Sequence, residues 1–135
     1  MTLDVRHSGS WQSGAPYVYH SGSWQVALSV SAYHSGSWQT VAQILSAVSI
    51  TGTTSVSNGT PINLGTSVTG GYGTLTYLWE KVSGSGSISG SATNSTVTIN
   101  PTASDSGGEF KVTVTDSLTG TTTDDSAVLT WGTPP

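Results

Sequence analysis

The pattern of apolar and polar residues changes character near residue 46 of this 135-residue chain. Before that point, aromatic and aliphatic residues stand in short groups on either side of the dipeptide Ser-Gly. After it, single apolar residues alternate with serine, threonine and asparagine. Alternation with a period of two is typical of strands that bury one face. The sequence therefore predicts an all-β chain, with a small repeat module at 1–45 and a β-sandwich at 46–135.

The first part contains the hexapeptide His-Ser-Gly-Ser-Trp-Gln three times, at 7–12, 20–25 and 34–39. Ser-Gly between aromatic and β-branched residues is a turn signal, because glycine accepts a positive φ. With a two-residue loop, the histidine faces the second serine, and the residue before the histidine faces the tryptophan. We therefore predict three β-hairpins with aromatic or cation–π cross-strand pairs. These pairs are Arg6 with Trp11, Tyr19 with Trp24, and Tyr33 with Trp38.

Three hairpins of this size need additional stabilisation. Units below about 40 residues usually depend on disulfides, a metal or oligomerisation, and this chain has no cysteine. The aromatic residues could converge on a pseudo-threefold core of their own, or they could be buried against a partner protein. We interpret them as the docking or core residues of the repeats: Trp11, Trp24, Trp38, Tyr19 and Tyr33.

The second part has the pattern of a β-sandwich. Short alternating runs, separated by turn residues every 8–12 positions, are typical of that architecture. The expected strands lie at 62–68, 75–79, 95–99, 110–114 and 127–131, and the turns at 70–71, 83–90, 104–108 and 119–122. The apolar stretch 41–48 fits either a strand or one helical turn, and its β-branched neighbours favour a strand.

Two motifs of this second part resemble the immunoglobulin-like superfamily, across about 85 residues. Trp79 in Tyr-Leu-Trp resembles the buried tryptophan of strand C, and the segment 105–112 resembles the corner that enters strand F. Phe110 stands where the corner tyrosine would be, and threonine and valine stand at the two cysteine positions. Packing therefore replaces the intersheet disulfide. The core and corner residues implied by the resemblance are Trp79, Phe110, Val112, Thr66 and Asp105.

The tryptophan repeats resemble Gly-x-Trp repeats in tail and other structural proteins of tailed bacteriophages. Cysteine-free immunoglobulin-like modules are known from phage virions and bacterial surface proteins. Together the resemblances imply a non-enzymatic virion protein, docked through 1–45 to other virion proteins in a homo-oligomeric or symmetric assembly. A tail position (fibre, baseplate or tip) is preferred. Capsid decoration, a module that binds host surface glycans, and a fragment of a bacterial surface protein are the alternatives.

The amino-acid composition excludes several classes of binding partner. Charged residues make up 7% of the chain, against about 25% in an average domain. Three basic residues beside seven acidic ones cannot build a phosphate-binding surface, so no nucleic acid partner is expected. No apolar run is long enough for membrane insertion. The start of the chain lacks the apolar core of a signal peptide. We therefore expect synthesis in the host cytoplasm and release within the virion.

Few residues are candidates for metal binding, sugar binding or catalysis. His7, His20 and His34 occupy equivalent repeat positions, and could meet around a metal or simply form a polar face of the hairpins. Tryptophan beside glutamine and histidine would also suit sugar stacking. Four aspartates, at 105, 116, 124 and 125, could gather around calcium. No Gly-x-Ser-x-Gly motif is present and the second part has no histidine, so we expect no enzyme and no cofactor.

Overall fold

The computed structural model describes residues 3–7, 10–14, 17–27, 29–102 and 106–132. Fourteen strands and no helix lie in these ranges, which confirms the predicted all-β class. No helix within the described ranges could therefore span a membrane.

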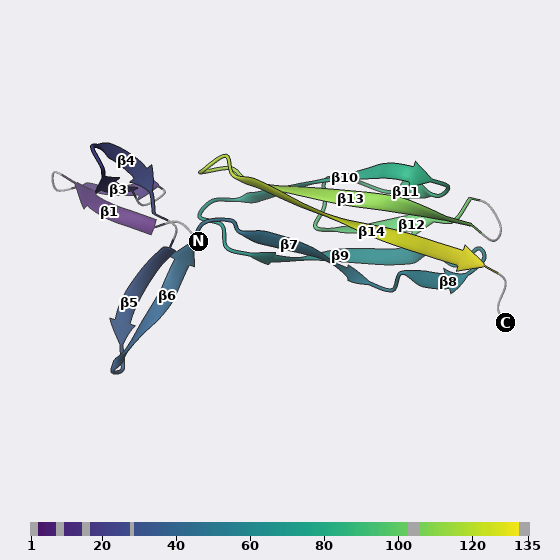
Figure 1. Cartoon of the computed structure of the whole chain (residues 1–135), viewed down its shortest axis with the longest axis horizontal. Helices are drawn as coiled ribbons and strands as arrows, with labels where there is room; N and C mark the ends of the chain where they lie inside the picture. Colours follow the sequence, from purple (N-terminus) through teal and green to yellow (C-terminus); the bar gives the residue numbers. More distant parts are fainter. Residues whose placement is uncertain (1–2, 8–9, 15–16, 28, 103–105, 133–135) are drawn as a thin grey trace.

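The three hexapeptides form three separate antiparallel hairpins, each a two-stranded sheet of its own. Every copy has the predicted register, with Arg6 opposite Trp11, Tyr19 opposite Trp24 and Tyr33 opposite Trp38. The hairpin of β5 and β6 extends away from the sandwich, at the end where β7 begins (Figure 1). The six strands are β1 (Leu3–His7), β2 (Ser10–Gly14), β3 (Tyr17–His20), β4 (Ser23–Val26), β5 (Ser29–His34) and β6 (Ser37–Gln43).

The other eight strands form two four-stranded sheets that face each other. One sheet has the order β10-β13-β14-β8 and the other β11-β12-β9-β7. All pairs are antiparallel except that of β8 with β14. The strands are β7 (Ala47–Gly52), β8 (Ser55–Ser57), β9 (Ile62–Thr69), β10 (Leu75–Gly84), β11 (Ser87–Ser89), β12 (Thr96–Asn100), β13 (Ser106–Asp116) and β14 (Thr122–Gly132).

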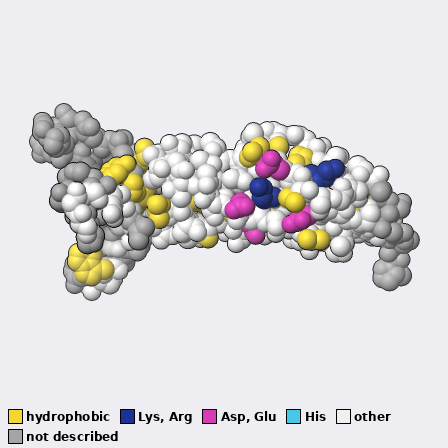
Figure 2. Space-filling view, turned by 45° about the horizontal axis from the view of Figure 1, so that its top comes forward, with side chains coloured by type: hydrophobic (Ala, Val, Ile, Leu, Met, Phe, Trp, Pro, Cys, Tyr) yellow, Lys and Arg dark blue, Asp and Glu magenta, His cyan; other side chains and the backbone are white. Residues whose placement is uncertain are grey.

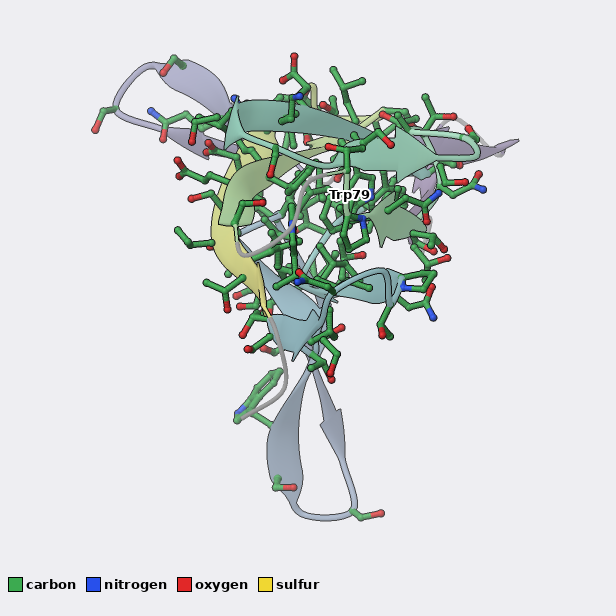
Figure 3. The ribbon with its side chains drawn as sticks, turned by 90° about the vertical axis from the view of Figure 1, so that its right-hand side faces the viewer. Trp79 is labelled. Carbon is green, nitrogen blue, oxygen red and sulfur yellow. The ribbon has the colours of Figure 1, made fainter. Side chains whose placement is uncertain are left out.

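The core lies between these two sheets, because every long strand turns its alternate apolar residues inward. Trp79 lies between the sheets in Figure 3 and is 2% exposed. Its indole Nε1–H donates to the carbonyl of Asn94 at 3.0 Å, so its polar atom is satisfied. The other members of the core cluster are Leu45, Val48, Ile62, Leu64, Val97, Ile99, Phe110, Val112, Val114, Leu129 and Trp131.

Most of the predicted core and strands are confirmed, with three differences. Thr66 is only half-buried and donates to the carbonyl of Ser95, so its assignment to the core is wrong. Leu64, two residues earlier on the inward face of β9, is fully buried instead. The region 83–90, expected to be a turn, contains the end of β10 and all of β11. Likewise, β13 begins at Ser106, inside the turn expected at 104–108, where Asp105 lies outside the described residues.

The hairpins are joined to the sandwich by a packed junction, which we define as Ala27, residues 42–45 and the loop 70–73. Leu45 is 3% exposed and packs into the sandwich core. The N–H of Gly71 donates to the carbonyl of Gln43 at 2.8 Å. The hydroxyl of Tyr72, a fully buried residue, donates to the carbonyl of Ala27 at 2.7 Å. The loop 70–73 therefore contacts the chain both just after the second hairpin and at the last residue of the third.

A buried carboxylate holds this loop in place. Asp116, at the end of β13, is fully buried and accepts N–H groups from Tyr72 at 2.6 Å, Gly73 at 3.0 Å and Leu118 at 2.8 Å. Burial by itself would raise the pKa of Asp116. The hydrogen bonds from Leu118, Tyr72 and Gly73 outweigh that effect, and the pKa lies below its ordinary value.

Candidate functional site

The tips of the repeated hairpins are the first candidate site. In the second copy the turn residues Ser21 and Gly22 have φ of 51° and 84°, and in the third Ser35 and Gly36 have φ of 50° and 85°. Positive φ at both central positions is characteristic of type I′ turns, whose twist matches that of the flanking strands. The repeat therefore reproduces one tip geometry, although residues 8–9 of the first copy lie outside the described ranges.

Two aromatic side chains of the hairpins are exposed, Trp38 close to the third turn and Tyr17 at the open end of the second hairpin. Trp38 is 73% exposed and Tyr17 is 56% exposed. Of the two alternatives, a shared core of the three tryptophans therefore does not hold for Trp38. The side chains of the other four predicted docking residues are outside the described set: Trp11, Trp24, Tyr19 and Tyr33.

The turns themselves present small polar groups. Ser21, Ser23, Ser35 and Ser37 are all exposed, and each pair brackets a glycine. No charged residue lies between Tyr17 and Gln43. These two tips therefore expose uncharged polar residues, and in the third copy they lie close to the exposed Trp38. Such a surface suits an uncharged partner surface with hydrogen-bonding groups and an apolar recess.

The three histidines occupy equivalent backbone positions, and their side chains are outside the described set. His7, His20 and His34 each end the first strand of a hairpin and pair with the second serine of the repeat. They belong to three different two-stranded sheets. Among the described residues, no group of three or more histidine or acidic side chains is arranged to hold a metal.

The three aspartates with described positions, Asp116, Asp124 and Asp125, do not form a shared calcium site. Asp116 uses its carboxylate for backbone N–H groups, as described above. The carboxylate of Asp125 accepts the N–H of Ile50 at 2.8 Å, which satisfies a donor on the edge strand β7. Asp124 is exposed on the other face of β14. Asp105 lies outside the described residues.

A shallow depression of about 470 Å³ lies over the sheet that contains β9 and β12. Among the residues that line it are Thr51, Asn63, Asn94, Thr96 and Thr98, with glycines on either side. None of its lining residues is charged or a histidine, so it holds no group suited to general acid–base catalysis.

Sequence reasoning missed Tyr72 entirely, and it considered Asp116 only for calcium and not as a residue that holds the junction between the hairpins and the sandwich. The signals were a tyrosine enclosed by glycines in Gly-Gly-Tyr-Gly at 70–73, and an aspartate at a strand end before the turn Ser-Leu-Thr-Gly at 117–120. A side chain bordered by glycines on both sides can enter a close backbone contact, and an aspartate in a turn can accept several N–H groups.

The turn geometry gives a direct prediction. Gly36→Ala is expected to destabilise the hairpin of β5 and β6 by about 1–2 kcal/mol, because an L-residue is disfavoured at positive φ. A Cβ at this position would have no atom within 4 Å, so the effect is purely conformational. Backbone chemical shifts of 29–43 should move toward random-coil values, while those of the sandwich stay unchanged. Ser35→Asn is the matched control and should retain the hairpin, because asparagine tolerates this conformation. Equal shifts in both variants would contradict a type I′ turn.

Comparison with models of known protein families gave no match, and no curated protein matched the sequence. Function is therefore inferred from the chain's own geometry, in which exposed aromatic and hydroxyl groups of the hairpins lie beyond one end of a β-sandwich.

Proposed function

We propose that this protein is a non-enzymatic structural component of a tailed-phage virion. The hairpins of residues 1–45 dock into a neighbouring virion protein, and the sandwich projects from the particle. The observation that carries this proposal is the exposure of Trp38, 73% in the isolated chain. A large aromatic side chain left uncovered beside polar turns is typical of a residue that is buried on binding, because tryptophan is enriched among the residues that dominate binding energy.

The arrangement of the sandwich supports the resemblance to immunoglobulin-like domains on which the proposal also draws. That fold has strands A, B, E and D in one sheet and C, F and G in the other. Here β7, β9, β12 and β11 lie in the first order, and β10, β13 and β14 in the second. A sandwich of this kind serves as a spacer as readily as a binding domain, so its shape alone does not define the function.

Within this proposal a position on the tail is preferred over decoration of the capsid. Localisation of the chain in an image reconstruction of the particle distinguishes the two. The second candidate function is binding of a host surface glycan, favoured by the same exposed indole, since an aromatic face can stack on a sugar ring while the serine hydroxyls of the turn bind its hydroxyl groups.

Incorporation into particles tests the docking role. Tagged wild-type and Trp38→Ala chains are co-expressed in cells that produce the particle, and their ratio in purified particles is measured by mass spectrometry. We expect the variant to be depleted about tenfold or more, which corresponds to a loss of at least about 1.4 kcal/mol at one anchoring residue. Leu118→Ala, a truncation of an exposed apolar residue on a sandwich turn, is the matched control and should incorporate normally.

Two outcomes would contradict the proposal. One is the absence of wild-type chain from particles, and the other is equal incorporation of wild type and Trp38→Ala. If the variant instead incorporates normally and loses binding on a glycan array, then glycan binding replaces docking as the role of the hairpins.

A further inference from the structure

The two outer faces of the sandwich differ in chemistry. The outer face of β7, β9, β11 and β12 carries serine, threonine and asparagine, with no charged residue among its strand positions. The outer face of β10, β13 and β14 carries charged and apolar side chains side by side, and Figure 2 shows acidic, basic and hydrophobic groups together there. We call this second surface the mixed face. Its charged and large apolar residues are Leu78, Glu80, Val82, Glu109, Lys111, Asp124 and Val128.

The apolar members of the mixed face are unusually exposed. Leu78 is 47% exposed, Val82 52% and Val128 67%, and all other large apolar residues of the sandwich strands are at least partly buried. Val82 projects at a β-bulge between Lys81 and Ser83, which interrupts the regular pairing with β13. Bulges commonly redirect a side chain at functional surfaces. Exposed apolar residues grouped on one face, and missing from the other, indicate an interaction surface.

A small hollow lies within this face. It has a volume of about 240 Å³, and three glycines contribute to its lining together with Glu109 and Val128. At Gly107 a Cβ would lie 2.2 Å from the carbonyl oxygen of Leu129, and at Gly84 2.4 Å from the carbonyl oxygen of Gly107. Close packing of strands therefore requires glycine at both positions. The absence of side chains there leaves a recess bordered by an aliphatic wall and a carboxylate.

The charge of the mixed face identifies the kind of partner. Glu80, Glu109 and Asp124 contribute three carboxylates, and Lys111 contributes one ammonium group whose Nζ lies 3.7 Å from Glu80 Oε2. The outward side chains Glu80, Glu109, Asp124 and Lys111 carry a net charge of −2, which becomes −1 when the neighbouring exposed Lys81 is counted. The carboxylate beside the hollow is that of Glu109, next to Val128 in the β13–β14 register. Lysine and arginine combine an aliphatic stem with a cationic head, so their side chains match a recess with an apolar wall and an acidic rim.

We propose that the mixed face is a docking surface for a protein segment that presents lysine or arginine flanked by aliphatic residues. The aliphatic groups cover Leu78, Val82 and Val128, and one basic side chain enters the hollow beside Glu109. This surface lies on the sandwich and is separate from the hairpin tips, so the inference does not depend on how the hairpins function.

Binding of a defined peptide tests this inference. An acetylated peptide of alternating lysine and valine is titrated into the full ¹⁵N-labelled chain, with lysine–serine and glutamate–valine peptides as controls. We expect saturable shifts of amides in β10, β13 and β14 with the lysine–valine peptide only. Glu109→Gln should weaken that binding several-fold. Val128→Lys should weaken it about tenfold, which corresponds to about 1.4 kcal/mol. Ser67→Lys adds the same charge to the opposite face and should leave the affinity within about twofold.

Several results would overturn the inference. They are equal binding of the lysine–serine peptide, equal loss of affinity in Ser67→Lys and Val128→Lys, and shifts that map to the hairpins or to the opposite face. Shifts of the mixed face that depend on protein concentration without peptide would show that a second copy of this chain covers it. If Val128→Lys does not fold, the affinity of Glu109→Gln for the lysine–valine peptide is compared with that of the wild type instead. Glu109 points outward and glutamine is similar in size, so this variant is expected to keep the strand.

Discussion

Asp116→Ala is expected to lower the free energy of unfolding by about 3–5 kcal/mol, because it leaves one buried and two partly buried N–H groups without an acceptor. Those donors belong to Tyr72, Gly73 and Leu118. Their loss should disorder both the loop 70–73 and the turn 117–121, and with them the junction to the hairpins. Urea denaturation followed by circular dichroism measures the change in stability.

Asp116→Asn separates the charge from the shape of this side chain. Asparagine keeps one oxygen acceptor but presents an amide donor to a backbone donor, so we expect a loss of about 2 kcal/mol, smaller than for alanine. Asp124→Asn removes a carboxylate from an exposed position of β14, and should change stability by less than about 0.5 kcal/mol. If the two asparagine variants were equally stable, the buried carboxylate would not hold the loop.

The same residue predicts a pH dependence. The pKa of Asp116 in the folded protein lies below the ordinary value of 3.8, so the unfolded state binds the proton more readily. The ionised carboxylate therefore stabilises the fold above pH 3.8, and this contribution is lost as the pH falls through the folded pKa. The stability difference between wild type and Asp116→Asn should consequently shrink in acid. A difference that grows with acidity would contradict the hydrogen-bonded, ionised state.

Local patterns were sufficient to predict the hairpins and most of the sandwich. Ser-Gly turns fix the register of each hairpin, because a two-residue loop leaves a single pairing for the flanking residues. The resemblance to immunoglobulin-like domains implied the burial of Phe110, Val112 and Trp79, and the alternation along their strands agrees with it, since a strand between two sheets must turn one face inward. The resemblance gave a wrong prediction for Thr66, which it placed in the core. Thr66 was placed at a cysteine position of the superfamily, whereas β9 buries its apolar residues Ile62 and Leu64.

The junction and the mixed face were not predicted, because both arise from contacts between residues distant in sequence. Tyr72 and Ala27 are 45 residues apart, and Tyr72 and Asp116 are 44 apart. No periodicity connects such positions. The mixed face is created by register, which places Glu109 beside Val128 and Lys111 opposite Glu80. Each strand, taken alone, shows only an ordinary alternation of inward and outward residues.

The junction determines whether the hairpins move with the sandwich, and Tyr72 is the residue that tests it. Tyr72→Ala removes a fully buried aromatic side chain, so a loss of about 3–5 kcal/mol in stability is expected. Tyr72→Phe keeps the ring and removes only the hydroxyl that donates to Ala27. It should cost about 1–2 kcal/mol, since the buried carbonyl loses its donor.

The motion of the hairpins distinguishes a positioning role of Tyr72 from a purely stabilising one. In the wild type, ¹⁵N relaxation should give residues 29–43 and the sandwich strands similar rotational correlation times, because Gly71 and Tyr72 hold the chain on either side of β5 and β6. In Tyr72→Phe the hairpin should tumble faster while the sandwich remains folded. Tyr77→Phe, a conservative change of a half-buried tyrosine on β10, is the matched control and should leave the hairpin motion unchanged.

Fast, independent tumbling already in the wild type would mean that the contacts of Tyr72 and Gly71 do not hold the hairpins in a fixed direction. In that case docking of the hairpins would leave the sandwich free to swing instead of setting the angle at which it projects.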